Sequence, residues 1–525
     1  MKDGDPENIS THVGGLPRFA VVGHPNKGKS SLVATLTGVA DIDIRPESGT
    51  TRVSATYPVV VQGQTLYELV DTPGFQRARG VWAWLEAQDV APDQRAAAVA
   101  RFVRAPEHAE RFPDEVELLK PLVDPDRPAG LLYVVDGAAP FGREYEPEME
   151  VLRWTGRPSL ALINPIGAAT HVEAWRAALG QYFRVVRVLD AVRARWDQRL
   201  DLLRAFGQLD EAWRVSLDHA VGALSDRRAE QAESAAWVIA RAVADLMAHT
   251  ETAARPEDAS AGEEDALRES LRTRLAESLT RIERQARREV EELYGHPGLE
   301  REERALPAAQ ALSADLFSEQ TWVLFGLSRA DWTKAGAAGG ALAGGVIDVS
   351  LAGASFLMGA AVGAAAGAAA GWWSGGRVAA LPVTRKWLGG GRKLVAGPAP
   401  GPTLGYVALS RALLHARLVA ERTHAQRGAL VVPDSQEVRQ ADAGSTPDEG
   451  PTSESNLSGH RASDPARDSA DAQVRALLEV QAPEPVRKEL GAAVLQLRKA
   501  GRSDDRRAAA VRRLAEKITP IIGRG

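Results

Sequence analysis

The stretch GHPNKGKSS, residues 23–31, has the residue types and spacing best suited to chemistry in this chain. It follows the apolar run FAVV and precedes LVATLTG, so a strand should lead into a loop and the loop into a helix. Glycines in such a loop let backbone N–H groups approach phosphate oxygens, and the helix N-terminus adds a partial positive charge. Lys29 should then reach the β- and γ-phosphates of a nucleotide, and Ser30 should hold Mg²⁺. The residues expected to contact the nucleotide are Gly23, His24, Pro25, Asn26, Lys27, Gly28, Lys29, Ser30 and Ser31.

Two more segments suit the same chemistry. DTPGF, residues 71–75, ends the strand-like run LYELV, and Asp71 can accept a hydrogen bond from water on Mg²⁺. The backbone N–H of Gly74 can meet the γ-phosphate and so detect its loss. ESGTTR, residues 47–52, lies in a polar loop, where Thr51 is the expected switch threonine that closes on Mg²⁺ and Thr50 is the near alternative. Lys29, Thr51, Asp71 and Gly74 are therefore the predicted catalytic set, and Ser30, Thr51 and Asp71 the predicted Mg²⁺ set.

Together these segments resemble the Era/TrmE branch of the P-loop GTPases. GHPNKGKSSL follows that branch's pattern GxPNxGKSxL, and GTTR and DTPGF resemble its two switches. The stretches DTPGFQRARGVWAWL and YVVDGAAPFGREYEPEMEVLRWTGRPSLALIN also resemble one bacterial subgroup, which joins this domain to a Gly/Ala-rich C-terminal domain of unknown function. The resemblance covers about residues 16–205. It implies an α/β GTPase fold that binds GTP, and side-by-side dimers of the GTPase domain.

Hydrolysis should be slow. Phe75 follows DTPG, where many small GTPases carry the glutamine that orients the attacking water, and a phenyl ring cannot make that hydrogen bond. The resemblance implies that a potassium ion, held partly by Asn26, can supply the missing charge. The alternative for Asn26 is a residue that only stabilises its loop.

The base-recognition segment is incomplete. Residues 160–167 read LALINPIG, so Asn164 stands where most GTPases begin Asn-Lys-x-Asp, but the Asp is absent. Asn164 can still bond to the purine and tie down the phosphate loop. Without the carboxylate, discrimination against ATP should fall. Asp190 could substitute for it, although a surface Asp is the plainer interpretation. GTP is the preferred nucleotide, with ATP as the alternative.

Composition limits the wider role. The chain has 525 residues, 44% hydrophobic and 25% charged, with a net charge of −5 and no cysteine, so disulfides and thiolate metal sites are excluded. The polar N-terminus is not a signal peptide. We expect an α/β GTPase domain with a mainly parallel sheet, then an all-α C-terminal region with a Gly/Ala-rich helical hairpin. The expected divisions are a flexible tail at 1–15, the GTPase domain at 16–209, a helical domain at 210–334, the hairpin at 335–376, a basic helical segment at 377–432, a disordered linker at 433–470 and a helical tail at 471–525.

The Gly/Ala block at 335–376 raises the question of a membrane. Its glycines recur every four residues, at 336, 340 and 344 and again from 359 to 375, a pattern that allows close helix packing in membranes. About 42 residues suffice for two spans of roughly 20. Basic residues on both flanks favour the cytoplasmic side, which suits a hairpin on the inner face of the bacterial cytoplasmic membrane. The alternative is a tightly packed core in a soluble helical domain, which Asp348 favours.

Three roles remain open from the sequence. The first is a GTP-dependent regulatory switch coupled to a membrane-associated helical domain. The second is a role in ribosome assembly or tRNA modification, as in Era and TrmE; the absence of a KH-type GxxG module and of cysteine counts against it, so RNA is the less favoured partner. The third is a nucleotide-binding scaffold that barely hydrolyses. The helix expected over 263–293 should be a solvated helix or a coiled-coil arm, and the basic tail at 487–524 could touch lipid or RNA or be solvated.

Overall fold

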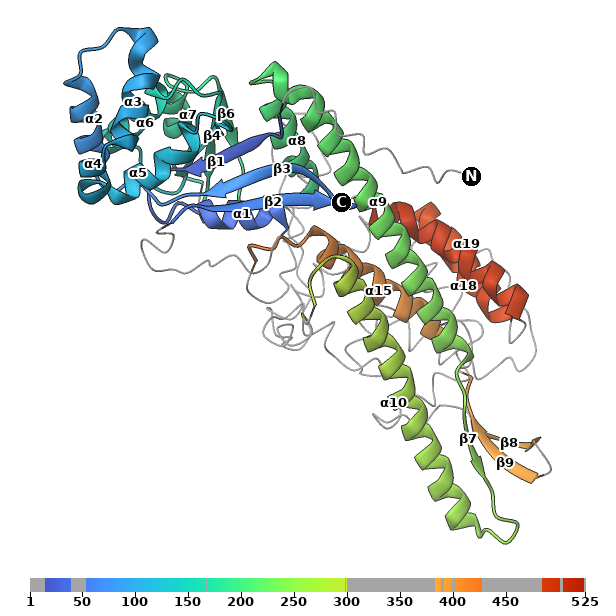
Figure 1. Cartoon of the computed structure of the whole chain (residues 1–525). Coiled ribbons are helices and arrows are strands. Elements are labelled where there is room, and N and C mark those ends of the chain that lie inside the picture. The colour runs from blue at the N-terminus through green and yellow to red at the C-terminus, as the bar shows by residue number, and fades with distance from the viewer. Residues whose placement is uncertain are drawn as a thin grey trace, which may run out of the picture. The chain divides into compact units, whose positions relative to one another are not determined.

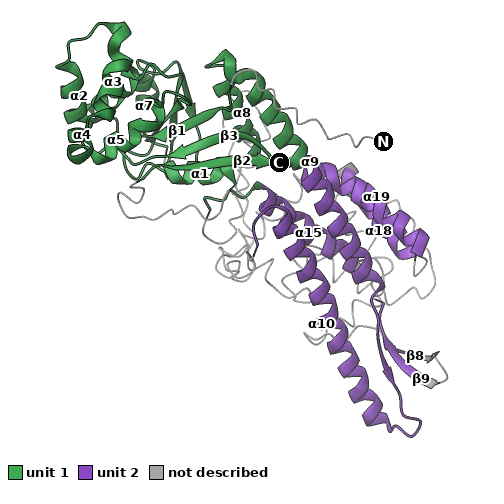
Figure 2. Cartoon of the chain, in the orientation of Figure 1, with its two compact units in different colours: residues 1–228, 421–427 green, residues 229–420, 428–525 purple. Residues whose placement is uncertain are grey.

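The computed structural model describes residues 15–38, 53–166, 169–297, 299, 383–388, 391–398, 403–426, 484–500 and 504–523. The chain forms two compact units (Figure 2). The first comprises residues 1–228 with the short segment 421–427, and the second comprises residues 229–420 and 428–525. The switch threonines Thr50 and Thr51, Gly167, the Gly/Ala block and the expected linker lie outside the described residues.

The first unit is built on a six-stranded sheet (Figure 1) with the order β2-β3-β1-β4-β5-β6. The strands are β1 Arg18–Val22, β2 Ala55–Val61, β3 Gln64–Asp71, β4 Gly130–Asp136, β5 Ser159–Asn164 and β6 Val185–Val188. All neighbours pair in parallel except β2 with β3. The inner strands read FAVV, LLYVV and LALI because a parallel sheet is covered on both faces. The predicted mainly parallel α/β domain is confirmed.

Helices cover both faces of this sheet. On one face, α1 Lys29–Thr37 and α8 Trp196–Gly207 share a core with the sheet and the start of α9. On the other face, α2 Ala78–Glu86, α6 Glu146–Trp154 and α7 Val172–Leu179 share a second core. β1 lies between β3 and β4, so the loop after β1 opens where the strand order reverses, the usual position of a ligand in such sheets.

A helical insert separates α2 from β4. It runs through η1 Pro92–Gln94, α3 Arg95–Arg104, α4 Pro106–Arg111, α5 Pro113–Leu119 and η2 Lys120–Leu122. Proline occupies the first position of α4 and of α5, where its missing N–H costs no hydrogen bond. Figure 1 shows α2 to α5 grouped together beside the sheet, and their apolar side chains join the same core as α6 and α7. We did not anticipate this insert from the sequence.

The second unit is mainly helical. Helix α9, Glu211–Ala248, starts in the first unit and continues into the second, where it packs with α10 Ala261–Leu293, α15 Thr403–Glu421, α18 Glu484–Ala500 and α19 Asp504–Ile522. The helical tail predicted near the C-terminus is thus present as α18 and α19. Apolar side chains of both, such as Val494 and Leu514, are buried in the core of the unit.

Two expectations for this region are wrong. The 377–432 segment is not helical throughout, because β8 Val383–Leu388 and β9 Gly391–Ala396 form an antiparallel sheet with β7 Glu251–Ala254, in the order β7-β9-β8. The alternating pattern of this hairpin is short, and its flanking glycines and basic residues hid it. Of the two alternatives for 263–293, a solvated helix is wrong for α10, since Leu271, Leu275 and Leu279 are essentially fully buried. Its many charges hid an apolar stripe at spacings of four.

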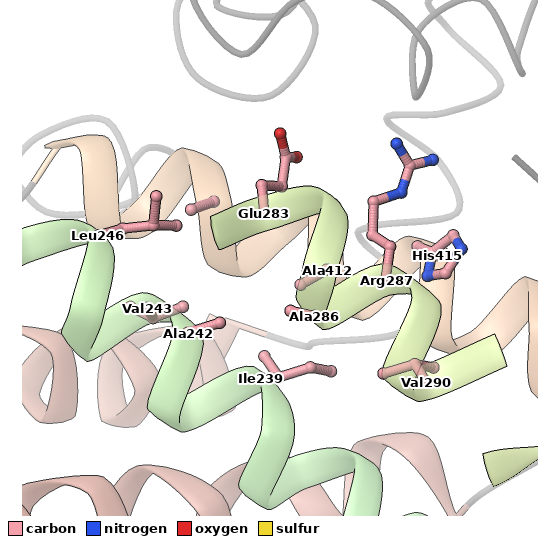
Figure 3. Close-up of a pocket in the computed structure, with 11 residues that line it drawn as sticks. Ile239, Ala242, Val243, Leu246, Glu283, Ala286, Arg287, Val290, Ala412 and His415 are labelled. Atoms are coloured by element: carbon pink, nitrogen blue, oxygen red, sulfur yellow. The ribbon is translucent and has the colours of Figure 1, made fainter. Parts of the chain in front are cut away.

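Charged side chains also line the interior of the second unit. Arg411 Nε lies 2.7 Å from Glu283 Oε1, and His415 Nε2 lies 3.1 Å from Glu291 Oε1. These four side chains, with Arg287, are each less than 10% exposed and form a row along α10 and α15. Figure 3 shows a small pocket beside this row, where Glu283 and Arg287 point away from Ile239. We refer to these five residues as the buried ionic row.

None of the described helices combines the length and the apolar character that crossing a membrane requires.

Candidate nucleotide-binding site

The loop after β1 has the conformation of a phosphate-binding loop. Gly28, the N-cap of α1, has φ 82°, and Asn26 has φ 59°. A Cβ on Gly28 would lie 2.2 Å from the side-chain nitrogen of Asn164, so glycine is required there. Asn is among the few residues that tolerate a positive φ. The exposed Asn26 is therefore suited to the loop whether or not it also contacts an ion.

Lys29 folds back over this loop. Its Nζ donates to the carbonyl of His24 at 2.9 Å and to that of Gly23 at 3.3 Å, which places the ammonium inside the ring of backbone groups. Burial lowers the pKa of Lys29 to about 8, while the carboxylates of Asp71 and Glu148 act in the opposite direction. A buried ammonium of this kind gains most from an incoming phosphate, because the phosphate supplies the negative charge that the site itself only partly provides.

Ser30 and Asp71 lie together at the end of β3. Ser30 Oγ donates to Asp71 Oδ2 at 2.7 Å, and Asp71 is 2% exposed. A hydroxyl and a carboxylate are the hard oxygen donors that Mg²⁺ prefers, so this pair fits the ion predicted from the sequence. Thr51, the third predicted Mg²⁺ residue, lies outside the described residues.

The DTPGF segment lies against the phosphate loop. A Cβ on Gly74 would come within 2.6 Å of Pro25 N, so only glycine allows this approach. The N–H of Phe75 donates to the carbonyl of Gly23 at 3.2 Å. The Phe75 ring is 1% exposed and belongs to the core that contains α2 and α5. The side chain at the usual glutamine position therefore points into the protein and anchors the segment.

Asn164 joins two loops. Its Nδ2 donates to Lys27 O at 3.0 Å, and its Oδ1 accepts the N–H of Ala191 at 2.9 Å. Ala191 O accepts from Thr35 Oγ1 at 2.5 Å, which ties the loop after β6 to α1. Asn164 thus holds the phosphate loop and the loop after β6 in register from the end of β5.

The Asp of Asn-Lys-x-Asp would stand at Gly167, three residues after Asn164, which lies outside the described residues. The possible substitute carboxylate, Asp190, is described. Asp190 lies in the loop after β6, and its Oδ1 accepts the N–H groups of Val192 and Arg193 at 2.9 and 3.1 Å. One oxygen of Asp190 therefore stabilises its own turn.

Three groups near the loop were missed from the sequence. Glu148 on α6, 2% exposed, lies 2.8 Å from His24 Nδ1 and accepts from Tyr133 OH at 2.9 Å. Burial and this carboxylate raise the pKa of Tyr133. Asp136, at the end of β4, lies 3.5 Å from Lys27 Nζ. Asp136 could have been predicted from the sequence, because it is an acidic residue at the end of an apolar strand. That Glu148 faces the phosphate loop depends on how α6 packs.

The third missed group comes from far along the chain. Thr423, in the 421–427 segment of the first unit, donates its hydroxyl to Val192 O at 2.5 Å. Ala425 is buried in the same core as α1 and α8. The residues just after α15 therefore support the loop that Asn164 holds. Nothing in the local sequence links residue 423 to residue 192.

Comparisons with known proteins agree with this geometry. Residues 18–154 match the model of a family described as 50S ribosome-binding GTPase. The fold and site define a P-loop GTPase domain of the Era-like kind. Residues 176–479 match the model of a family described as a domain of unknown function, DUF3482, and the chain belongs to that family. This second match includes both the loop after β6 and Thr423.

Similar curated proteins match only a small part of the chain. GTPase Der of Mycoplasma pneumoniae is 38% identical over 86 residues, 16% of this chain and 19% of the relative. GTPase Der of Microcystis aeruginosa is 44% identical over 64 residues, 12% of this chain and 14% of the relative. The chain thus spans about a fifth or less of these relatives.

Solved structures of Era also align with the chain. One, in complex with MgGDPNP and a segment of 16S ribosomal RNA, covers 54% of this chain and 90% of its own, with 16% identity and a TM-score of 0.26. A variant of Aquifex aeolicus Era bound to GDP.AlF4- aligns with 17% identity and a TM-score of 0.24. These scores are too low to support a conclusion about this chain.

Proposed function

We propose that the protein binds GTP with Mg²⁺ and hydrolyses it slowly, as a regulatory switch. The observation that carries the proposal is the buried Lys29 ammonium inside the phosphate loop, with the Ser30 and Asp71 oxygens 2.7 Å apart beside it. Lys29 neutralises charge on the β- and γ-phosphates, and the N–H groups of the loop and of α1 add to it. Ser30, Asp71 and Thr51 would hold Mg²⁺, which would supply positive charge to the phosphates.

The rate of hydrolysis follows from Phe75. Its ring is packed in the core, so it brings no polar group to the attacking water. Potassium beside the phosphates, with Asn26 as one of its contacts, is the proposed substitute. Turnover in potassium should exceed turnover in sodium, and Asn26→Ala should remove that difference with little change in GDP affinity. Equal rates in the two salts would show that Asn26 only shapes the loop.

The proposed nucleotide is GTP, with reduced discrimination against ATP. Asn164 holds the loop that would bear the purine, but a glycine, Gly167, stands where the carboxylate would accept the guanine N1–H and 2-amino groups. Competition between GTP and ATP for the Mg²⁺-loaded protein tests this directly. We expect GTP to bind more tightly, by less than in GTPases with a complete Asn-Lys-x-Asp. Tighter binding of ATP would overturn the GTP assignment and leave a nucleotide-binding protein of relaxed specificity.

The output of the switch is proposed to be a membrane-associated helical domain. The Gly/Ala block at 335–376 with basic flanks supports this proposal, and the proposed location is the inner face of the cytoplasmic membrane. Alkaline carbonate extraction of membranes tests it: the intact protein should stay in the pellet and dissolve in detergent. A monodisperse protein in the high-speed supernatant would contradict it.

Two rivals have their own outcomes in the same experiments. One matching family is described as 50S ribosome-binding GTPase, which supports a role on ribosomal RNA. Recovery in ribosomal fractions rather than membranes would favour that role. Binding without turnover in any salt would favour a scaffold. A dimer of GTPase domains, expected by family resemblance, should appear in light scattering only with a GTP analogue.

A further inference from the structure

Helix α5 of the insert contacts the segment that follows DTPGF. Its Glu115 is 1% exposed, and one carboxylate oxygen, Oε1, accepts two backbone N–H groups, that of Gln76 at 2.8 Å and that of Arg77. Arg77 is the N-cap of α2, and its own side chain makes no capping hydrogen bond. Glu115 therefore supplies, from 38 residues away, the negative charge that a helix N-terminus favours.

The same helix contacts the chain that follows the other predicted switch. Glu117 Oε1 accepts the N–H of Ser54 at 3.1 Å, and the carbonyl of Glu117 accepts from Ser54 Oγ at 3.0 Å. Ser54 comes directly before β2 and two residues after ESGTTR ends. Lys120 holds the other oxygen of Glu117 at 2.5 Å. One helix of seven residues thus binds the chain directly after each of the two segments whose rearrangement a GTPase uses to report its nucleotide.

Helix α5 is itself firmly held. Val116, Leu118 and Leu119 are at most 3% exposed and lie in the core that also contains Phe75 and α2. A rigid helix that holds a mobile segment through hydrogen bonds favours one of the segment's arrangements over the others. With Glu115 in place, Phe75 N–H reaches Gly23 O and Gly74 lies against Pro25, so the start of the switch is beside the phosphate loop.

We infer that Glu115 and Glu117 are positioning residues: Glu115 holds the chain that follows DTPGF beside the phosphate loop, Glu117 holds the residue before β2, and together they favour the triphosphate-bound state. The inference rests on the proposed function, because it needs Gly74 N–H to meet a γ-phosphate. Neither glutamate touches the nucleotide. Glu115 acts through the backbone of Gln76 and Arg77, and Glu117 through Ser54. The rival explanation is that both residues only stabilise the fold, in which case they do not distinguish GTP from GDP.

The test is the affinity ratio between a non-hydrolysable GTP analogue and GDP, both with Mg²⁺. In Glu115→Ala, the affinity for the analogue should fall by about tenfold or more while that for GDP changes by less than about threefold, since two charge-assisted hydrogen bonds are lost from one state. Glu110→Ala, which removes an exposed carboxylate from the same insert, is the matched control and should leave both affinities unchanged. Equal losses for both nucleotides would overturn the inference.

A second pair of variants keeps the test usable if Glu115→Ala does not fold. Glu115→Gln retains a carbonyl oxygen that can accept both N–H groups, so it should fold and shift the ratio in the same direction by a smaller factor. Glu117→Ala should also lower the ratio, whereas Lys120→Ala, which removes only the ion pair to Glu117, should not. An unshifted ratio in Glu115→Gln and Glu117→Ala would overturn the inference. A wild-type protein that binds neither nucleotide would instead refute the proposed function.

Discussion

The two units use buried charge in opposite ways. In the first, Lys29 is surrounded by backbone carbonyls and has two carboxylates nearby, so its charge is only partly met within the protein. In the second, the polar side chains of the buried ionic row contact one another, as the Glu283 carboxylate does the Arg411 guanidinium and Glu291 does the His415 ring. The difference teaches that burial of charge does not by itself identify a site. What identifies a site is whether groups of the protein neutralise the buried charge or whether a ligand must do so.

The largest expected effect lies in the helical unit. Glu283→Ala takes the carboxylate away from Arg411, which is 2% exposed, and should lower the free energy of unfolding by about 3 kcal/mol. Urea denaturation measures this. The matched control is Glu289→Ala, which breaks the surface pair with Arg241 on neighbouring helices and should cost less than about 1 kcal/mol. GTP affinity should not change in either variant. A change in GTP affinity for Glu283→Ala at unchanged stability would mean that the row is functional.

The second effect lies in the phosphate loop, and here GTP affinity should change while stability does not. Lys29→Ala should weaken GTP binding by about a hundredfold or more, because the phosphates lose a desolvated charge partner. It should not lower stability, since the variant no longer buries an ammonium whose pKa burial has lowered. Isothermal titration with Mg²⁺-GTP and urea denaturation give the two numbers. Lys517→Ala, which removes an exposed lysine of α19, is the control. If GTP affinity did not change, Lys29 would not bind the phosphates, and the contrast drawn between the two units would be wrong.

The pH dependence of binding sharpens the same contrast. The pKa of Lys29 is about 8 in the free protein, and a bound phosphate favours the protonated form, so binding should be full below pH 8 and should weaken as pH rises above it. The fall should approach about tenfold per pH unit. Dissociation constants for GDP between pH 7 and pH 9.5 measure it. Lys29→Arg, whose side chain stays charged, should flatten the curve. A flat curve in the wild type would show that Lys29 is protonated throughout.

The smallest expected effect concerns the segment after α15. Thr423→Ala removes the hydroxyl that bonds to Val192 O, which should raise the rate of GDP release by about threefold to tenfold, corresponding to one hydrogen bond of about 1 kcal/mol. Release of a fluorescent GDP analogue measures it. Thr519→Ala removes a hydroxyl that bonds only within its own helix, α19, and should have no effect. An unchanged rate of GDP release in Thr423→Ala would show that Asn164 and Thr35 hold the loop after β6 without help from Thr423.

The sequence by itself determined the phosphate site and its place in the sheet. GHPNKGKSS, DTPGF and the strand ending at Asn164 are local patterns, and the carboxyl ends of parallel strands must meet at one edge. Strand, loop and helix signals within a few residues of one another therefore sufficed for Lys29, Ser30, Asp71 and Asn164. The sequence also showed that phenylalanine replaces the usual glutamine at position 75. It did not show that the Phe75 ring is buried.

Only the tertiary structure decided what holds this site in place. Glu115 bonds to residues 76 and 77, Glu117 to residue 54 and Thr423 to residue 192, and none of these pairs is closer than 38 residues in sequence. The buried ionic row was hidden for the same reason, because the charges of α10 resemble those of a solvated helix until α15 packs against them. Local residue spacing fixes backbone conformation and loop chemistry. Which distant side chain completes a hydrogen bond depends on how helices pack, and that is a property of the whole fold.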